Sequence, residues 1–141
     1  MSENENLDVA KEFTHAWNAH DLDKVNSLYS ENAILEDYAL GLKAIGKKKL
    51  RKAALNIFNI FPDVIMEIRN LFSCGDQVIL EGYLNGTNTG PITFPVTEKP
   101  PTGLHIHFPF VRIYQIKKRL ISEVRDYWDL MTLFRCLKLK V

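Results

Sequence analysis

Residues 64–87 read VIMEIRNLFSCGDQVILEGYLNGT, and this stretch decides the fold class. We expect Val64 to Ser73 and Gln77 to Thr87 to be consecutive strands of an antiparallel sheet. Between them, Cys74-Gly75-Asp76 predicts a tight turn, since glycine supplies the positive φ that turns need. The sheet is expected to continue after a loop at residues 88–103, which contains a short edge strand at Ile92-Phe94.

Two further strands follow in the sequence. His105 to Ile116 predicts a long strand, Lys117-Lys118-Arg119 a polar turn, and Leu120 to about Leu133 the last strand. The second half of the chain therefore indicates an antiparallel meander.

The first half is helical in pattern. Apolar residues recur every three or four positions in the first helix, at Leu7, Ala10, Phe13 and Trp17. Asp21 is the expected N-cap of a short second helix, which carries Leu22, Val25, Leu28 and Tyr29. Residues 33–38 are expected to be a short strand, and Gly41 and Gly46 bracket a loop. A third helix is expected from about Lys47 until Pro62, since proline cannot continue the hydrogen-bond ladder.

Helices followed by a meander indicate the α+β class. Three helices can cover only one face of the sheet. A curved sheet wrapped on helices leaves a cone-shaped cavity, which is the default ligand site.

The composition sets further limits. The chain has 141 residues, 46% of them apolar, which predicts a single domain over residues 1–141. With a net charge of +1, no global field favours nucleic acid or an anionic membrane as partner. The polar, acidic start and the absence of an 18-residue apolar run predict a cytoplasmic protein that neither carries a signal peptide nor spans a membrane.

Several blocks of sequence together carry a family resemblance. They are residues 13–23, Phe61-Pro62-Asp63, Gly75-Asp76-Gln77-Val78, residues 86–91, Pro100-Pro101-Thr102-Gly103 and residues 120–129. The chain resembles the SnoaL-like polyketide cyclases of the nuclear transport factor 2-like superfamily, which also contains ketosteroid isomerase and limonene epoxide hydrolase. The resemblance implies a cone-like barrel of three N-terminal helices on a curved, mostly antiparallel sheet, as in cystatin-like folds. It also implies a homodimer that pairs through the outer sheet face, and a cavity for a small aromatic or polycyclic ketone.

Three positions depart from the family pattern. Asn88 replaces the histidine of a Gly-Thr-His-Thr-Gly block, residues 117–119 replace a glycine turn, and Cys136-Leu137-Lys138 replaces Gln-Leu-Gly. The Asn88 and Cys136 departures slightly favour the alternative function, a small-molecule-binding or accessory protein without chemistry.

The resemblance implies that Asp129, in the expected last strand, is a general acid/base for an aldol cyclisation or an isomerisation. A carboxylate walled by aromatic rings is desolvated, so its pKa rises and it can remove a proton next to a carbonyl. In the simpler interpretation Asp129 caps a turn or pairs with Arg125 or Arg135. Asp126 competes with it: if Val124 and Trp128 point to the core, Asp126 is the inward carboxylate.

His105 and His107 alternate on one strand face, and His107 or a tyrosine hydroxyl is the candidate donor to an enolate oxygen. A metal site needs a third ligand, which no spacing marks, so we expect no metal and no other cofactor. Arg112 stands among Phe108, Phe110 and Tyr114. It is either a paired interior charge or an edge residue whose stem covers the sheet.

Asp37 resembles by position the aspartate base of ketosteroid isomerase, with Tyr29 or Tyr38 as donor to an oxyanion. A solvated loop carboxylate is the simpler interpretation of Asp37. The Asp-Arg-Asp relay of limonene epoxide hydrolase finds no close match among Arg112, Arg125, Asp126 and Asp129, and ranks third. The full set of candidate cavity-lining residues is Trp17, Tyr29, Asp37, Tyr38, His105, Arg112, Asp126 and Tyr127.

Overall fold

The computed structural model describes residues 2–140 and arranges them as helices on one curved sheet. In chain order the elements are α1 (Glu3–Asn18), α2 (Leu22–Ser27), β1 (Tyr29–Asp37), β2 (Leu42–Ile45), α3 (Lys47–Ile60), β3 (Ile65–Cys74), β4 (Gln77–Thr87), β5 (His105–Lys117), β6 (Leu120–Tyr127) and α4 (Leu130–Leu137).

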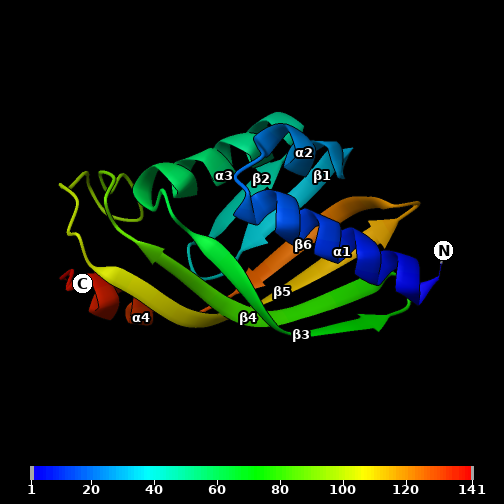
Figure 1. Ribbon diagram of the computed structural model, residues 1–141. Helices are drawn as coiled ribbons and strands as arrows, with labels where there is room; N and C mark the ends of the chain where they lie inside the picture. Colours follow the sequence, from blue (N-terminus) through cyan, green and yellow to red (C-terminus); the bar gives the residue numbers. More distant parts are fainter. Residues whose placement is uncertain (1, 141) are drawn as a thin grey trace.

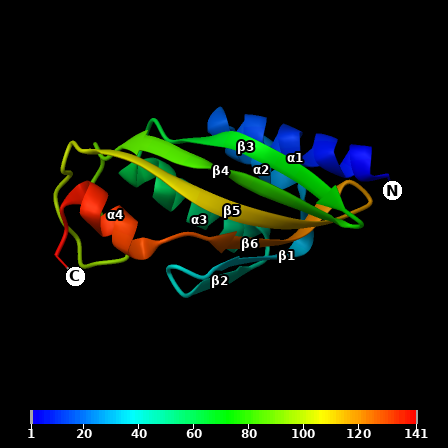
Figure 2. The same ribbon diagram turned by 90° about the horizontal axis from the view of Figure 1, so that it is seen from below.

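The six strands form one sheet in the order β2-β1-β6-β5-β4-β3. Strand β1 runs parallel to β6, and every other neighbouring pair is antiparallel. Helices α1, α2 and α3 lie on one face of this sheet, and α4 lies at the end opposite the N-terminus (Figure 1). Seen from below, the opposite face of the sheet is open (Figure 2). The predicted α+β class and the curved, mostly antiparallel sheet are confirmed.

Helix α1 begins and ends on side-chain hydrogen bonds. The Ser2 hydroxyl accepts a bond from the Glu5 N–H at 3.1 Å, which satisfies one of the free donors of the first turn. At the other end Asn18 pairs with the backbone of Met66: its Nδ2 donates to the carbonyl at 2.9 Å and its Oδ1 accepts from the N–H at 2.8 Å. These two hydrogen bonds fix the C-terminal end of α1 on β3, so that Trp17 faces the interior.

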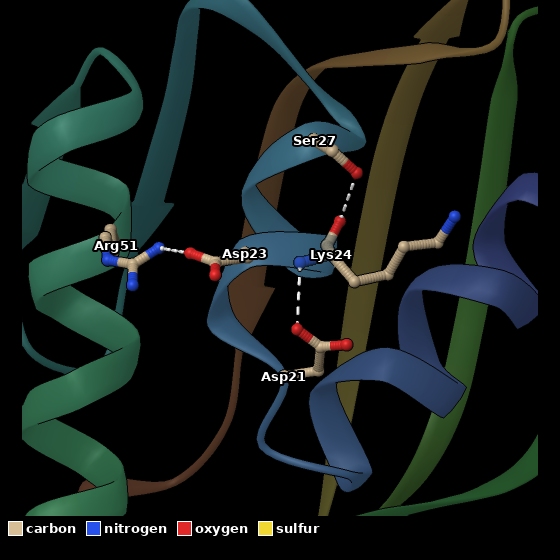
Figure 3. Close-up of polar contacts among 5 residues, drawn as sticks. All are labelled: Asp21, Asp23, Lys24, Ser27 and Arg51. Carbon is tan, nitrogen blue, oxygen red and sulfur yellow. Dashed lines mark hydrogen bonds and ion pairs between the residues drawn. The ribbon is translucent and has the colours of Figure 1, made fainter.

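The short helix α2 is capped locally and tied to α3 (Figure 3). Asp21 is the N-cap, as predicted, and accepts a hydrogen bond from the Lys24 N–H at 3.1 Å. Ser27 donates to the Lys24 carbonyl at 2.6 Å. Arg51 of α3 reaches Asp23 at 2.7 Å, an exposed ion pair of the kind that contributes about 0–1 kcal/mol.

The predicted last strand is wrong beyond Tyr127. Strand β6 ends there, Asp129 becomes an N-cap, and the chain continues as α4. Leu130, Leu133 and Leu137 have the three- and four-residue spacing of a helix, which packs its apolar side over the end of the sheet. None of the helices in residues 2–140 is long and apolar enough to cross a membrane.

Three smaller expectations are also corrected. Residues 42–45, expected to be loop, form β2 on the edge of the sheet beside β1. Tyr29, expected in the second helix, is the first residue of β1. The edge strand expected at Ile92-Phe94 is reduced to a single bridge between Ile92 and Lys99.

Asn88 holds together the two ends of the loop between β4 and β5. Its fully buried side chain donates to the carbonyls of Ile60 at 3.1 Å and Gly90 at 2.9 Å, and accepts from the N–H and hydroxyl of Thr102, both at 2.8 Å. Gly90 itself passes so close to α3 that a Cβ would lie 1.6 Å from the Asn59 carbonyl oxygen. The departure from the family pattern at position 88 therefore has a structural role, which is to anchor this loop.

Asn88→Ala is expected to lower the free energy of unfolding by about 2–4 kcal/mol, because it leaves several buried polar groups without partners. Asn59→Ala, at an exposed position of α3, is the matched control and should change stability by less than about 0.5 kcal/mol. Urea unfolding measures both. Equal effects of the two substitutions would contradict the anchoring role.

Candidate functional site

A cavity lies between the helices and the sheet and has two adjoining chambers. The inner one, about 100 Å³, is closed at one end by α4 through Leu133 and Leu137. The wider one, about 650 Å³, extends along α3 to the β1–β2 turn and falls in the usual size range of small-molecule pockets. The residues that line both chambers are Trp17, Asp37, Leu40, Ile57, Phe94, Pro95, Arg112 and Asp126. All the charged side chains of the lining are in this shared set.

A buried ion pair forms the polar floor of the cavity. Arg112 of β5 and Asp126 of β6 are direct cross-strand partners. The Arg112 Nε lies 2.6 Å from one carboxylate oxygen and its Nη2 lies 2.9 Å from the other. Burial works against the charge of Arg112, but the Asp126 carboxylate, together with Tyr114 and Tyr29, outweighs it and raises the pKa of the guanidinium. The guanidinium carbon also lies 5.7 Å from the ring centroids of Phe13 and Tyr114, in range of cation–π attraction.

Asp37 is the second carboxylate at the floor. It lies in β1 opposite Asp126, because β1 and β6 pair in parallel in that register. Its Oδ2 accepts from the Trp128 indole N–H at 2.8 Å and its Oδ1 from the Leu40 N–H at 2.9 Å. Burial raises the pKa of Asp37, and these two hydrogen bonds counteract the rise only in part. Since a carboxylate has about four acceptor positions, Asp37 can still accept a proton or a hydrogen bond from a ligand.

Trp128 orients Asp37 from the neighbouring strand end. Its indole ring stacks on Phe108, with 5.4 Å between centroids and 18° between planes. The ring is therefore fixed on one face while its N–H reaches the carboxylate. This arrangement holds Asp37 in one orientation before any ligand arrives.

Tyr29 lines the wider chamber. Its ring is buried and packs edge-on against Phe13, with centroids 5.3 Å apart. Burial raises the pKa of Tyr29, while the nearby Arg112 charge lowers it by a smaller amount. The phenol therefore stays protonated near neutral pH, and a ligand near the Arg112–Asp126 pair would meet it as a hydrogen-bond donor.

Asp129 does not lie in the cavity. It is the exposed N-cap of α4, and its carboxylate accepts from the Met131 N–H at 3.1 Å and from the Thr132 hydroxyl at 2.8 Å. The hydrogen bond from Thr132 lowers the pKa of Asp129, the opposite of the shift expected for a desolvated base. Arg135 lies 3.6 Å away, so the environment is that of the simpler interpretation, a cap with an ion pair.

Both candidate histidines lie on the outer face of the sheet. His107 is half exposed, stacks on Tyr83 with centroids 4.7 Å apart, and lies 3.9 Å from a carboxylate oxygen of Glu67. His105 is exposed, and its Nδ1 lies 3.1 Å from the Thr87 hydroxyl. Neither ring lines a chamber.

Tyr38 and Tyr127 also lie outside the cavity. Their half-exposed rings stack on each other with 4.9 Å between centroids. The structure thus brings together Trp17, Tyr29, Asp37, Arg112 and Asp126 in the cavity, and separates the remaining candidates from them.

The sequence shows no close match to an Asp-Arg-Asp relay among Arg112, Arg125, Asp126 and Asp129, and its pattern does not join Asp37 to Arg112 and Asp126. The structure places Asp37 beside the Arg112–Asp126 pair, whereas Arg125 and Asp129 line neither chamber. Asp126 lies two residues after the apolar Val124, so the two side chains share one face of the strand, and both are buried. This spacing is the feature of the sequence that indicates an inward Asp126. Within residues 2–140, no group of three or more His, Cys, Asp or Glu side chains has the arrangement of a metal site.

Comparison with known proteins agrees with this architecture. The profile of the SnoaL-like polyketide cyclase family matches residues 7–137, and the chain belongs to this family. A comparison with curated proteins finds no match.

Solved structures of the same fold have low sequence identity to this chain. A SnoaL-like protein from Jannaschia sp. CCS1 is 18% identical, with a TM-score of 0.85 over 98% of this chain and 94% of that one. AclR from Streptomyces galilaeus is 20% identical, with a TM-score of 0.83 over 99% and 89% of the two chains. A SnoaL-like protein from Shewanella denitrificans OS-217 is 19% identical, with a TM-score of 0.83 over 94% and 96%. At this identity the likeness establishes the fold.

The raised pKa of Asp37 predicts a pH-dependent difference between wild type and Asp37→Asn. The native state binds this proton more tightly than the unfolded chain, so the wild type loses stability as pH rises from the unfolded value through the raised native one. Thermal unfolding from pH 4 to pH 8 should therefore show the wild type becoming less stable relative to Asp37→Asn. Asp8→Asn, at an exposed position of α1, should show no such trend. A constant difference for Asp37→Asn would contradict the desolvation of Asp37.

Proposed function

We propose that the protein is an acid–base enzyme of the cyclase or isomerase kind, acting on a small aromatic or polycyclic ketone in the cavity. The observation that carries the proposal is Asp37, a desolvated carboxylate that Trp128 and the Leu40 N–H hold toward both chambers. A base is most effective when its pKa is close to the working pH, and burial shifts the pKa of Asp37 in that direction.

In the proposed reaction Asp37 removes a proton from the carbon next to the ketone. The C–H electron pair moves into the carbonyl, and the developing enolate oxygen accepts a hydrogen bond from the Tyr29 hydroxyl. In an isomerase the proton returns from Asp37 to another carbon. In a cyclase the enolate carbon attacks a second carbonyl of the same molecule, whose oxygen becomes an alkoxide and takes up the proton from Asp37, which regenerates the base.

The geometry favours Asp37 over Asp129 as the base and Tyr29 over His107 as the donor. Asp129 is exposed and its pKa is lowered, so it is a weaker base than Asp37. His107 lies on the opposite face of the sheet from the cavity.

Two other functions are supported by particular observations. The inner chamber is lined mostly by aliphatic and aromatic side chains, which suits a protein that binds an apolar molecule without converting it. Asp37, Arg112 and Asp126 lie together in the lining of both chambers. This arrangement supports a second reaction, in which Asp37 deprotonates a water molecule and the resulting hydroxide attacks an epoxide. Arg112 donates hydrogen bonds to Asp126, whereas Asp37 accepts from Trp128 and Leu40, so the three residues do not form a complete relay and cyclisation or isomerisation remains the first proposal.

Turnover of a panel of aromatic and polycyclic ketones tests the proposal. Asp37→Asn should lower kcat/KM by about 10²–10⁴-fold, the usual contribution of a general base. The ligand-induced rise in Tm should persist in this variant, since the apolar lining is unchanged. Loss of turnover in Asp129→Asn with retention in Asp37→Asn would restore the sequence-based assignment. Binding by all variants without conversion would identify a binding protein.

We also propose that the protein is a homodimer that pairs through the outer sheet face. Ile79 and Ile113 are cross-strand partners there and are only partly buried in the single chain. Apolar groups at the centre of an open sheet face gain free energy when a second copy covers them.

Light scattering coupled to size exclusion should give twice the chain mass for wild type. Ile113→Lys should shift the population to monomer, because a dimer would bury the new charge without a partner. Leu55→Lys, at an exposed apolar position of α3, is the matched control and should remain dimeric. A monomeric wild type would exclude the proposed dimer.

A further inference from the structure

The cavity lining contains more acidic than basic side chains. Among the described residues that line the two chambers, those with a carboxyl or guanidinium group are Asp37, Asp126 and Arg112. The bidentate bonds between Arg112 and Asp126 compensate those two charges at short range. One negative charge, that of ionised Asp37, is therefore left without a cationic side chain in hydrogen-bond contact.

The contacts of Asp37 leave room for a cation. Its partners are an indole N–H and a backbone N–H, both neutral donors. A carboxylate with two such bonds retains acceptor positions on both oxygens. A cation that entered the cavity would supply the missing countercharge and would reverse the destabilising effect of burial on the ionised carboxylate.

The surrounding walls suit a cation with an apolar body. Aromatic side chains from four parts of the chain line the inner chamber, namely Trp17 of α1, Phe94 of the β4–β5 loop, Phe108 of β5, and Trp128 after β6. Aromatic ring faces attract ammonium groups, and the attraction grows when the cation is shielded from water. The aliphatic residues of α3 and α4, such as Ile57 and Leu137, complete a lining for the hydrocarbon part.

We propose that the cavity binds hydrophobic amines, with the protonated nitrogen on the Asp37 carboxylate and the apolar body in the inner chamber. A carboxylate ligand is disfavoured because its charge would repel Asp37 and would be desolvated. A neutral ligand of the same shape gains the apolar contacts without the ion pair. The proposal rests on the cavity of the proposed function and specifies the charge of the ligand, but it does not depend on turnover.

Three probes of matched shape test the proposal: 4-phenylbutylamine, 4-phenylbutan-1-ol and 4-phenylbutanoate. Titration calorimetry with the full chain at pH 7.5 should give a Kd for the amine about tenfold below that of the alcohol, which corresponds to about 1.4 kcal/mol. The carboxylate should bind about tenfold more weakly than the alcohol or show no heat. An alcohol that binds as tightly as the amine, a carboxylate that binds tightest, or no binding by any probe would overturn the proposal.

Two variants test whether the preference for the amine over the alcohol depends on Asp37. In Asp37→Asn the advantage of the amine over the alcohol should fall to less than about threefold, while the affinity for the alcohol is retained. Asp8→Asn removes the same charge from an exposed position of α1 and should keep the full advantage. An amine preference that persists in Asp37→Asn would overturn the proposal. Conversion of neutral ketones without any amine preference would leave the proposed function standing and remove only this inference.

Discussion

The buried pair of Arg112 and Asp126 is the constraint on which the cavity depends. Two charges out of water are tolerated only when each has a partner of good geometry, and removing one of them typically costs about 3–5 kcal/mol. Here the two side chains are direct cross-strand partners of β5 and β6, so the sheet register itself sets the bidentate geometry. The cavity floor is therefore as rigid as the sheet, which is the condition that a preorganised site requires.

The proposed base, the Asp37 carboxylate, lies beside the Arg112–Asp126 pair but takes no part in its hydrogen bonds. Asp37 comes from β1 and receives its hydrogen bonds from Trp128 and from the turn after its own strand. The Arg112 charge is largely taken up by Asp126, so burial remains the dominant influence on the pKa of Asp37. The same division of charge explains both the proposed base and the proposed preference for a cationic ligand.

The periodic elements of the fold were predictable because their patterns are local. The apolar spacing of α1, the stop at Pro62 and the turn at Gly75 fix boundaries within a few residues. The region after Tyr127 was mispredicted because an apolar run of this length fits a strand and a short helix equally well. Only the N-cap at Asp129 and packing over the sheet end distinguish them, and the second of these is a tertiary contact.

By itself the sequence determined the α+β class, the order of helices before strands and membership of the SnoaL-like family, since these follow from local periodicity and from motif order along the chain. It did not determine which face of the last strand is interior, and so it left Asp126 and Asp129 as rivals. Tertiary structure decided this, and through the parallel pairing of β1 with β6 it placed Asp37, already a candidate from the sequence, beside Asp126. The physical reason is that desolvation and charge pairing act between residues close in space, and Asp37 and Asp126 meet only after the chain between them has folded.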